Sequence, residues 1–295
     1  MKISFHRIYT KKGLELCGLL YQPKKKTKTV IVHVHGMGGN FYENKFLDVF
    51  AKIFVDNNIA FCVFNNSGSE FIKDIFIKTK NKKSFIRIGN SREKFEDCII
   101  DIESYINFLK RNNFKKIHLS GHSLGCSKVA YYLSKNKHKE IKSLILVSPS
   151  DMIGLVKSDK EFSYRYKNDI LTAKKMIEHG NGNDFMPKMV WNEYPITANS
   201  YVSIFSENSK AAIFNFYNSN DNFNVISNIK HPIFMTIGTK DDILFMPLIK
   251  MIEILKKKAK LTKRLEIKVV ENATHDWRGY EKSLANSIKN WVKSL

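Results

Sequence analysis

The sequence is poor in cysteine and lacks any long apolar run, and both absences limit what the protein can be. Its four cysteines are scattered among 295 residues, with no Cys-x-x-Cys pair. This usage argues against a zinc knuckle or a disulfide framework and suits a reducing compartment. No apolar stretch approaches the ~18 residues that span a bilayer, and no secretory-signal core follows Lys2. We therefore expect a cytoplasmic protein without a transmembrane segment.

Acidic residues are also scarce: 28 Asp and Glu stand against 49 Lys and Arg, so the formal net charge is +21. Such a balance favours anionic partners such as nucleic acid, a membrane surface or an anionic small molecule. Only seven of the basic residues are arginine, however, the side chain best suited to bidentate recognition of bases and phosphates. We therefore interpret the charge mainly as a solvated surface and expect no specific nucleic-acid partner.

Strand-like and helix-like patterns alternate along the chain. Eight segments are predicted to be strands: residues 3–9, 14–21, 29–35, 59–64, 116–122, 144–150, 232–238 and 265–271. The first two are expected to form an antiparallel edge pair, while apolar residues with a 3.6-residue period between later strands predict helices. This alternation favours an α/β fold, with a mostly parallel central sheet of about eight strands flanked by helices.

One helix-start signal lies at Asn90. Glu93 follows three residues later, which resembles a capping box, and apolar residues from Phe95 to Leu109 keep the helical period. We predict that a long helix begins at Asn90.

Residues 151–230 interrupt the alternation. They contain no strong strand pattern but two or three amphipathic helical patterns rich in aromatic residues. We predict a helical cap, or lid, over one end of the sheet, with residues 1–150 and 231–295 as the core. The aromatic side chains would either pack the cap onto the core or line an apolar substrate pocket beneath it.

A serine lies between two glycines in the pattern Gly121-His-Ser123-Leu-Gly125. So short a pattern is informative only in a suitable structural context. Here a strand-like segment precedes it and a helical apolar stripe follows it. A sharp turn at this position would present the hydroxyl at the edge of the sheet, with both glycines leaving room for the backbone. Ser123 is therefore our candidate nucleophile.

Three further segments complete a resemblance to the α/β-hydrolase superfamily: "HVHGMGG" at 33–39, "GTKDD" at 238–242 and "NATHDW" at 272–277. The resemblance covers almost the whole chain and implies an α/β-hydrolase fold with a helical lid. The chain is similar to lipase-like, serine-aminopeptidase-like and siderophore-esterase-like lidded serine hydrolases. It departs from many relatives at "FNNSGSEF" (64–71), where they have an Asp and a Gly-x-Gly turn, and at Cys126. The branch therefore stays open.

The resemblance implies a catalytic triad around the serine. His275, in a loop after the last predicted strand, would be the base that removes the proton of Ser123. Asp241 has the spacing that the superfamily favours for the acid that orients this histidine. Its neighbour Asp242 is the alternative, and Asp151 is a more remote one.

An oxyanion hole is implied as well. The backbone N–H groups of Leu124 and Met37 would stabilise the negative charge that develops on the attacked carbonyl oxygen. The glycines around the second donor, Gly36, Gly38 and Gly39, would let the backbone turn inward. The simpler interpretation of this segment is a glycine-rich turn without a catalytic role.

A metal site is not expected, because no acidic cluster accompanies the histidines near these motifs. We expect no metal and no cofactor. The sequence thus indicates a serine hydrolase that cleaves a carboxylic ester or thioester of a small, partly apolar substrate through an acyl-serine intermediate. An acyltransferase, a peptidase or amidase, and a C–C hydrolase could use the same triad. A non-catalytic binding protein with this fold is a further alternative, and the oligomeric state is not indicated.

Overall fold

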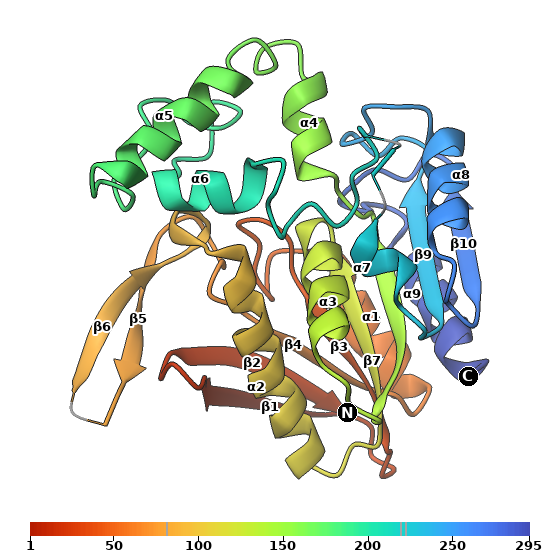
Figure 1. Cartoon of the computed structure of the whole chain (residues 1–295). Helices are drawn as coiled ribbons and strands as arrows, with labels where there is room; N and C mark the ends of the chain where they lie inside the picture. Colours follow the sequence, from red (N-terminus) through yellow and green to blue (C-terminus); the bar gives the residue numbers. More distant parts are fainter. Residues whose placement is uncertain (81, 219, 222) are drawn as a thin grey trace.

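The computed structural model describes residues 1–80, 82–218, 220–221 and 223–295. Its centre is an eight-stranded sheet with the order β1-β2-β4-β3-β7-β8-β9-β10 (Figure 1). The edge strands β1 and β2 pair in antiparallel fashion, β2 is antiparallel to β4, and the remaining pairs are parallel. The strands are β1 (Lys2–Tyr9), β2 (Glu15–Gln22), β3 (Thr29–Val34), β4 (Ala60–Phe64), β7 (Lys116–His122), β8 (Ile141–Val147), β9 (Ile233–Gly238) and β10 (Leu265–Val270). The predicted mostly parallel sheet is confirmed.

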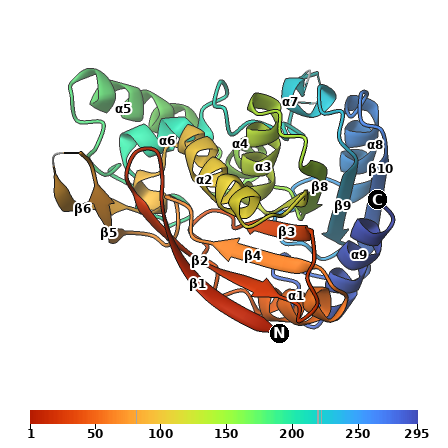
Figure 2. The same cartoon turned by 90° about the horizontal axis from the view of Figure 1, so that it is seen from below.

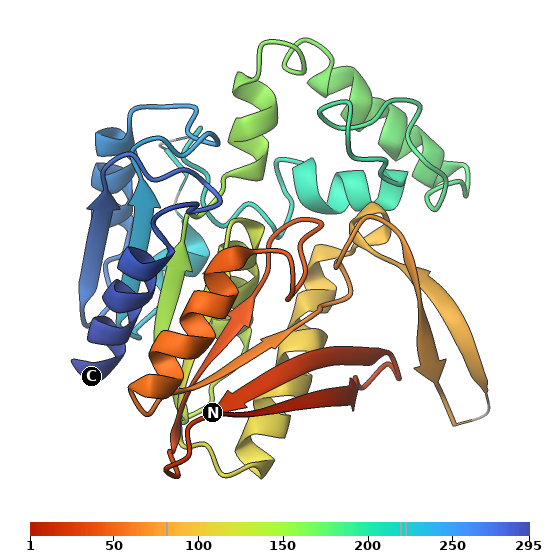
Figure 3. The same ribbon diagram turned by 180° about the vertical axis from the view of Figure 1, so that it is seen from behind.

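Helices cover both faces of this sheet. The helices α1 (Lys45–Asp56) and α9 (Glu281–Lys293) pack together on one face, as Figure 3 shows from behind. The opposite face is covered by α2 (Cys98–Arg111) and α3 (Leu124–Lys135), which Figure 2 shows from below, and by α8 (Leu248–Lys258). Because each helix has one apolar stripe, each face encloses its own hydrophobic core. The inner strands β3 and β4 are buried on both faces, as is usual for parallel strands between two helical layers.

The segment between β8 and β9 is helical, as predicted. It contains α4 (Met152–Ser158), α5 (Tyr166–Glu178), α6 (Ala198–Phe205) and the short α7 (Asn224–Ser227). Figure 1 shows α4, α5 and α6 above the carboxyl ends of the central strands, whereas α7 lies beside α3. The division of the chain into a core and a cap stays a prediction. In the described part of the chain, no helix is both long enough and apolar enough to cross a membrane.

Two features between β4 and α2 differ from the sequence prediction. A separate hairpin, β5 (Lys73–Lys78) with β6 (Lys83–Ile88), extends away from the main sheet. The long helix begins at Cys98 rather than at Asn90, after two short 3₁₀ turns, Asn90–Arg92 and Phe95–Asp97. The predicted capping box at Asn90 is wrong because the carboxylate of Glu93 does not return to the backbone. It instead forms an ion pair with Lys128, with 2.6 Å between Oε1 and Nζ.

Candidate active site

Ser123 occupies the turn where β7 ends and α3 begins. Its backbone has φ 56° and ψ −127°, a conformation that is strained for any residue with a side chain. The turn is fixed by its own hydrogen bonds. The Ser123 N–H donates to the Val147 carbonyl at 3.0 Å, and the Ser123 carbonyl accepts from the Cys126 N–H at 2.9 Å. Strain held at one partly buried serine is a common feature of functional sites.

The glycines around this turn are required by space. A Cβ on Gly121 would lie 2.3 Å from the Gly125 carbonyl oxygen, and one on Gly125 would lie 2.2 Å from the Val34 oxygen. A Cβ on Gly36 would come within 2.9 Å of the Ser123 Cβ. No side chain fits at any of these three positions without a backbone shift. The "HVHGMGG" segment therefore packs directly against the serine.

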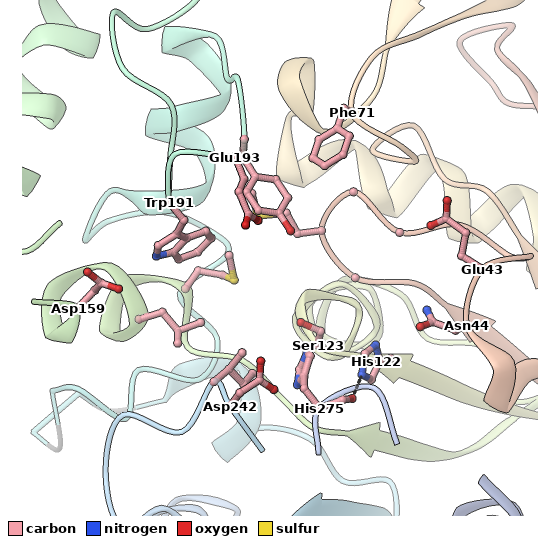
Figure 4. Close-up of a pocket in the computed structure, with 18 residues that line it drawn as sticks. Glu43, Asn44, Phe71, His122, Ser123, Asp159, Trp191, Glu193, Asp242 and His275 are labelled. Carbon is pink, nitrogen blue, oxygen red and sulfur yellow. Dashed lines mark hydrogen bonds between the residues drawn. The ribbon is translucent and has the colours of Figure 1, made fainter. Parts of the chain in front are cut away.

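His275 and Asp241 form a hydrogen-bonded pair, with 2.9 Å between Nδ1 and Oδ1. Asp241 is buried in the turn after β9 and also accepts a hydrogen bond from the Ile243 N–H. Burial raises the pKa of Asp241, but the hydrogen bond and charge of His275 outweigh it, so the pKa lies below the ordinary value. Asp242, the alternative acid, is exposed and points into the cavity instead (Figure 4).

Ser123 and His275 open into one cavity of about 570 Å³ beneath the α4–α6 segment. Figure 4 shows their side chains next to each other. No hydrogen bond joins these two described side chains; contacts of this kind often tighten only when a substrate binds. The cavity is large enough for a small organic molecule.

Met37 lines the same cavity, and Leu124 begins α3 directly after Ser123. The segment before Met37 is held by His35, whose Nδ1–H donates to the Gly36 carbonyl at 2.9 Å and whose Nε2 accepts from the Asn66 N–H at 3.1 Å. These partners define the tautomer. Burial keeps the pKa of His35 well below its usual range, so this imidazole is neutral. The use of the Met37 and Leu124 N–H groups as an oxyanion hole stays a prediction.

His122 is a contributor that the sequence motifs did not reveal. Its Nε2–H donates to the backbone carbonyl of His275 at 2.8 Å, and the two rings lie 4.6 Å apart. Burial, followed by the charge of His275, lowers the pKa of His122 to about 3. His122 therefore fixes the loop that carries His275 while staying neutral. No sequence signal predicts this contact, because the two residues are far apart in the chain.

The other sheet histidines bond to serines rather than to one another. His33 bonds to Ser120 through Nδ1 at 3.0 Å, and His118 bonds to Ser143 through Nδ1 at 2.8 Å. Among the described residues, no group of three His, Cys, Asp or Glu could hold a metal ion.

The aromatic residues of the segment between β8 and β9 have different surroundings, and the use of the cavity as a substrate pocket stays a prediction. Trp191 and Tyr194 line the cavity, whereas others belong to the hydrophobic core: Tyr201, Phe205, Phe214 and Phe216. Phe185 and Tyr217 are exposed.

A family model described as "Protein of unknown function (DUF1749)" matches residues 76–294, well over half of the chain. The chain belongs to this family. No curated protein matches it significantly.

Solved structures resemble this DUF1749 member over nearly its full length. Est1E from Butyrivibrio proteoclasticus with bound ferulic acid has a TM-score of 0.67 at 16% identity, covering 98% of each chain. DcsB in complex with its substrate analogue has a TM-score of 0.70 at 11% identity, covering 99% of each chain. The Pyrococcus furiosus esterase Pf2001 has a TM-score of 0.62 at 17% identity, covering 99% of this chain and 91% of the esterase. The chain therefore has the α/β-hydrolase fold.

Proposed function

We propose that the protein is a carboxylic ester hydrolase that works through an acyl-Ser123 intermediate. The observation that carries the proposal is the strained Ser123 turn, which opens into the same cavity as a histidine backed by a buried aspartate. Fold alone does not fix chemistry. The description of one structural neighbour, Pf2001, as an esterase supports the reaction class that the site geometry suggests.

In this mechanism, Nε2 of His275 removes the proton of Ser123 as Oγ attacks the carbonyl carbon of the ester. The Asp241 carboxylate keeps the Nδ1–H tautomer and stabilises the imidazolium. The N–H groups of Met37 and Leu124 stabilise the oxyanion. His275 then protonates the leaving alcohol or thiol. In the second half, the same histidine activates water, which releases the acid.

The proposed substrate is a small, partly apolar ester or thioester. A cavity of about 570 Å³ with Met37, Met152, Leu155 and Trp191 in its wall supports this size and polarity. A cytoplasmic location is part of the proposal, and the four free thiols support it.

The direct test replaces the nucleophile. Ser123→Ala is expected to abolish both the hydrolysis of small activated esters and labelling by a fluorophosphonate, with an unchanged circular dichroism spectrum. Ser134→Ala, an exposed serine on the same helix, serves as the control and is expected to keep both activities. Labelling that persists in Ser123→Ala would refute the proposal.

A further inference from the structure

The charged side chains that line the cavity have the sign opposite to that of the whole protein. The lining contains four carboxylates, Glu43, Asp159, Glu193 and Asp242, and no lysine or arginine from the described residues. None of the four forms a salt bridge with another described side chain. In a chain with a net charge of +21, this is a local reversal of sign. Asp159 also accepts hydrogen bonds from the backbone N–H groups of Glu161 and Phe162, whereas the other three carboxylates have no hydrogen-bond donor among the described residues.

The four carboxylates come from separate parts of the fold and surround the proposed nucleophile. Asp159 follows α4, Glu193 belongs to the loop before α6, Asp242 follows β9 and Glu43 precedes α1. In Figure 4, Asp159 and Glu193 lie toward the cap and Glu43 lies on the opposite side, with Ser123 and His275 nearer the sheet. A ligand that reaches the serine therefore passes between carboxylates.

An aromatic wall lies among these carboxylates. The ring of Tyr194 contacts Trp191 edge-on at 5.9 Å between centroids, and Phe71 at 5.2 Å. All three side chains line the cavity. The backbone of Trp191 has φ 48°, a strained conformation for so bulky a residue. Its side chain lines the cavity.

Among the described residues, no lysine or arginine side chain stacks on the faces of these three rings. Lysine and arginine side chains stack on other aromatic residues of the same region, such as Phe162, Tyr166 and Tyr217. No such stacking occurs on Trp191, Tyr194 or Phe71 within the described ranges. Aromatic faces next to carboxylates form the environment that binds organic ammonium groups.

We propose that this cavity selects substrates that carry an organic ammonium group next to the ester, an inference that rests on the proposed ester hydrolysis. The aromatic wall contacts the alkyl groups of the ammonium, and the carboxylates neutralise its charge. Lysines that lie more than about 8 Å from the bound ammonium are largely screened at physiological salt, whereas the carboxylates that line the cavity are not. A substrate with an anionic group in the place of the ammonium is disfavoured, because the same carboxylates repel it.

The test compares two esters of the same acid and nearly the same shape: a choline ester and its uncharged carbon analogue, the 3,3-dimethylbutyl ester. At physiological ionic strength, where distant lysines are screened, we expect kcat/KM to be about tenfold higher for the choline ester, as one cation–π and carboxylate site supports. Glu193→Gln, Asp159→Asn and Trp191→Leu are each expected to lower this ratio toward one. Glu253→Gln, an exposed carboxylate on α8 outside the cavity, is the matched control and should leave the ratio unchanged.

A binding measurement separates this inference from the catalytic proposal. Ser123→Ala is titrated by calorimetry with phenyltrimethylammonium and with benzenesulfonate, and only the cation is expected to bind, more weakly after Glu193→Gln. If the neutral ester is hydrolysed and the ratio of kcat/KM for the choline ester to kcat/KM for the neutral ester is at or below one, the ammonium selection is overturned. The hydrolase proposal then stays intact. Binding of the cation without hydrolysis of either ester would uphold the selection and overturn the hydrolase proposal. Failure of both binding and hydrolysis would overturn both.

Discussion

Asp241 and Asp242 are neighbours in sequence but have different surroundings. One is buried and bonded to the Nδ1–H of His275, and the other is exposed in the cavity wall. An acid that orients a catalytic imidazole must hold the ring and its tautomer through a direct hydrogen bond. The geometry therefore favours Asp241 for this role.

We expect Asp241→Asn to lower kcat toward a neutral activated ester by about 10³- to 10⁴-fold, because the amide favours the wrong tautomer of His275. Asp242→Asn is expected to have a far smaller effect on the same substrate. Steady-state kinetics on both variants, with circular dichroism as a check of folding, test this prediction. A larger loss in Asp242→Asn would assign the acid to the other aspartate.

Much of the site could be predicted from local sequence. The serine between glycines, the "HVHGMGG" segment and the histidine after the last strand each follow a strand, and parallel strands bring their carboxyl ends to one edge. The choice between Asp241 and Asp242 needed coordinates, because it depends on how the loop after β9 turns. Two other features depend on segments that are far apart in the chain. One is the hydrogen bond from His122 to the His275 carbonyl, and the other is the position of Glu43, Asp159 and Glu193 around one cavity. No local pattern predicts them.

The elements between β4 and α2 were the hardest to predict. The β5–β6 hairpin exposes much of both faces, including Phe85, so it lacks the apolar alternation that marks a half-buried strand. Glu93 has the spacing of a capping-box residue, but its carboxylate pairs with a lysine from another element instead. It lies buried with Lys128, which extends from α3, and these two side chains are 2% and 0% exposed. A long-range ion pair of this kind overrides a local capping signal.

The buried ion pair between Glu93 and Lys128 is expected to contribute to the free energy of unfolding. Lys128→Met would leave the Glu93 carboxylate buried without its partner, and such a change typically costs about 3–5 kcal/mol of unfolding free energy. The double variant Lys128→Met/Glu93→Leu is expected to recover most of the loss, because neither member of the pair then leaves an unpaired buried charge. Urea unfolding of the single and double variants measures the coupling. A cost below about 1 kcal/mol for Lys128→Met would mean that Glu93 finds water or another partner.

At the scale of the whole molecule, titratable groups are buried both in the central sheet and in the segments packed against it. Burial lowers the pKa of four neutral imidazoles: His33 and His122 to about 3, His118 to about 4, and His35 well below its usual range. Burial also raises the pKa of two carboxyl groups, Asp101 and Asp151, to about 6. Between pH 6 and pH 4, the histidines bind protons only on unfolding, whereas the aspartates release protons on unfolding. Within this set of six groups the histidines outnumber the aspartates, so together they take up about two protons on unfolding.

The free energy of unfolding is therefore expected to fall as the pH decreases from about 6.5 toward 4. Each proton taken up on unfolding contributes about 1.4 kcal/mol per pH unit. His33→Asn, whose amide can replace Nδ1 as the partner of Ser120, should remove one such proton and give a shallower pH dependence than the wild-type protein. Urea unfolding of both proteins at pH 7, 6 and 5 measures the two slopes. Equal slopes would mean that His33 already binds its proton in the folded state, which its burial among Phe46, Phe50 and Phe61 opposes.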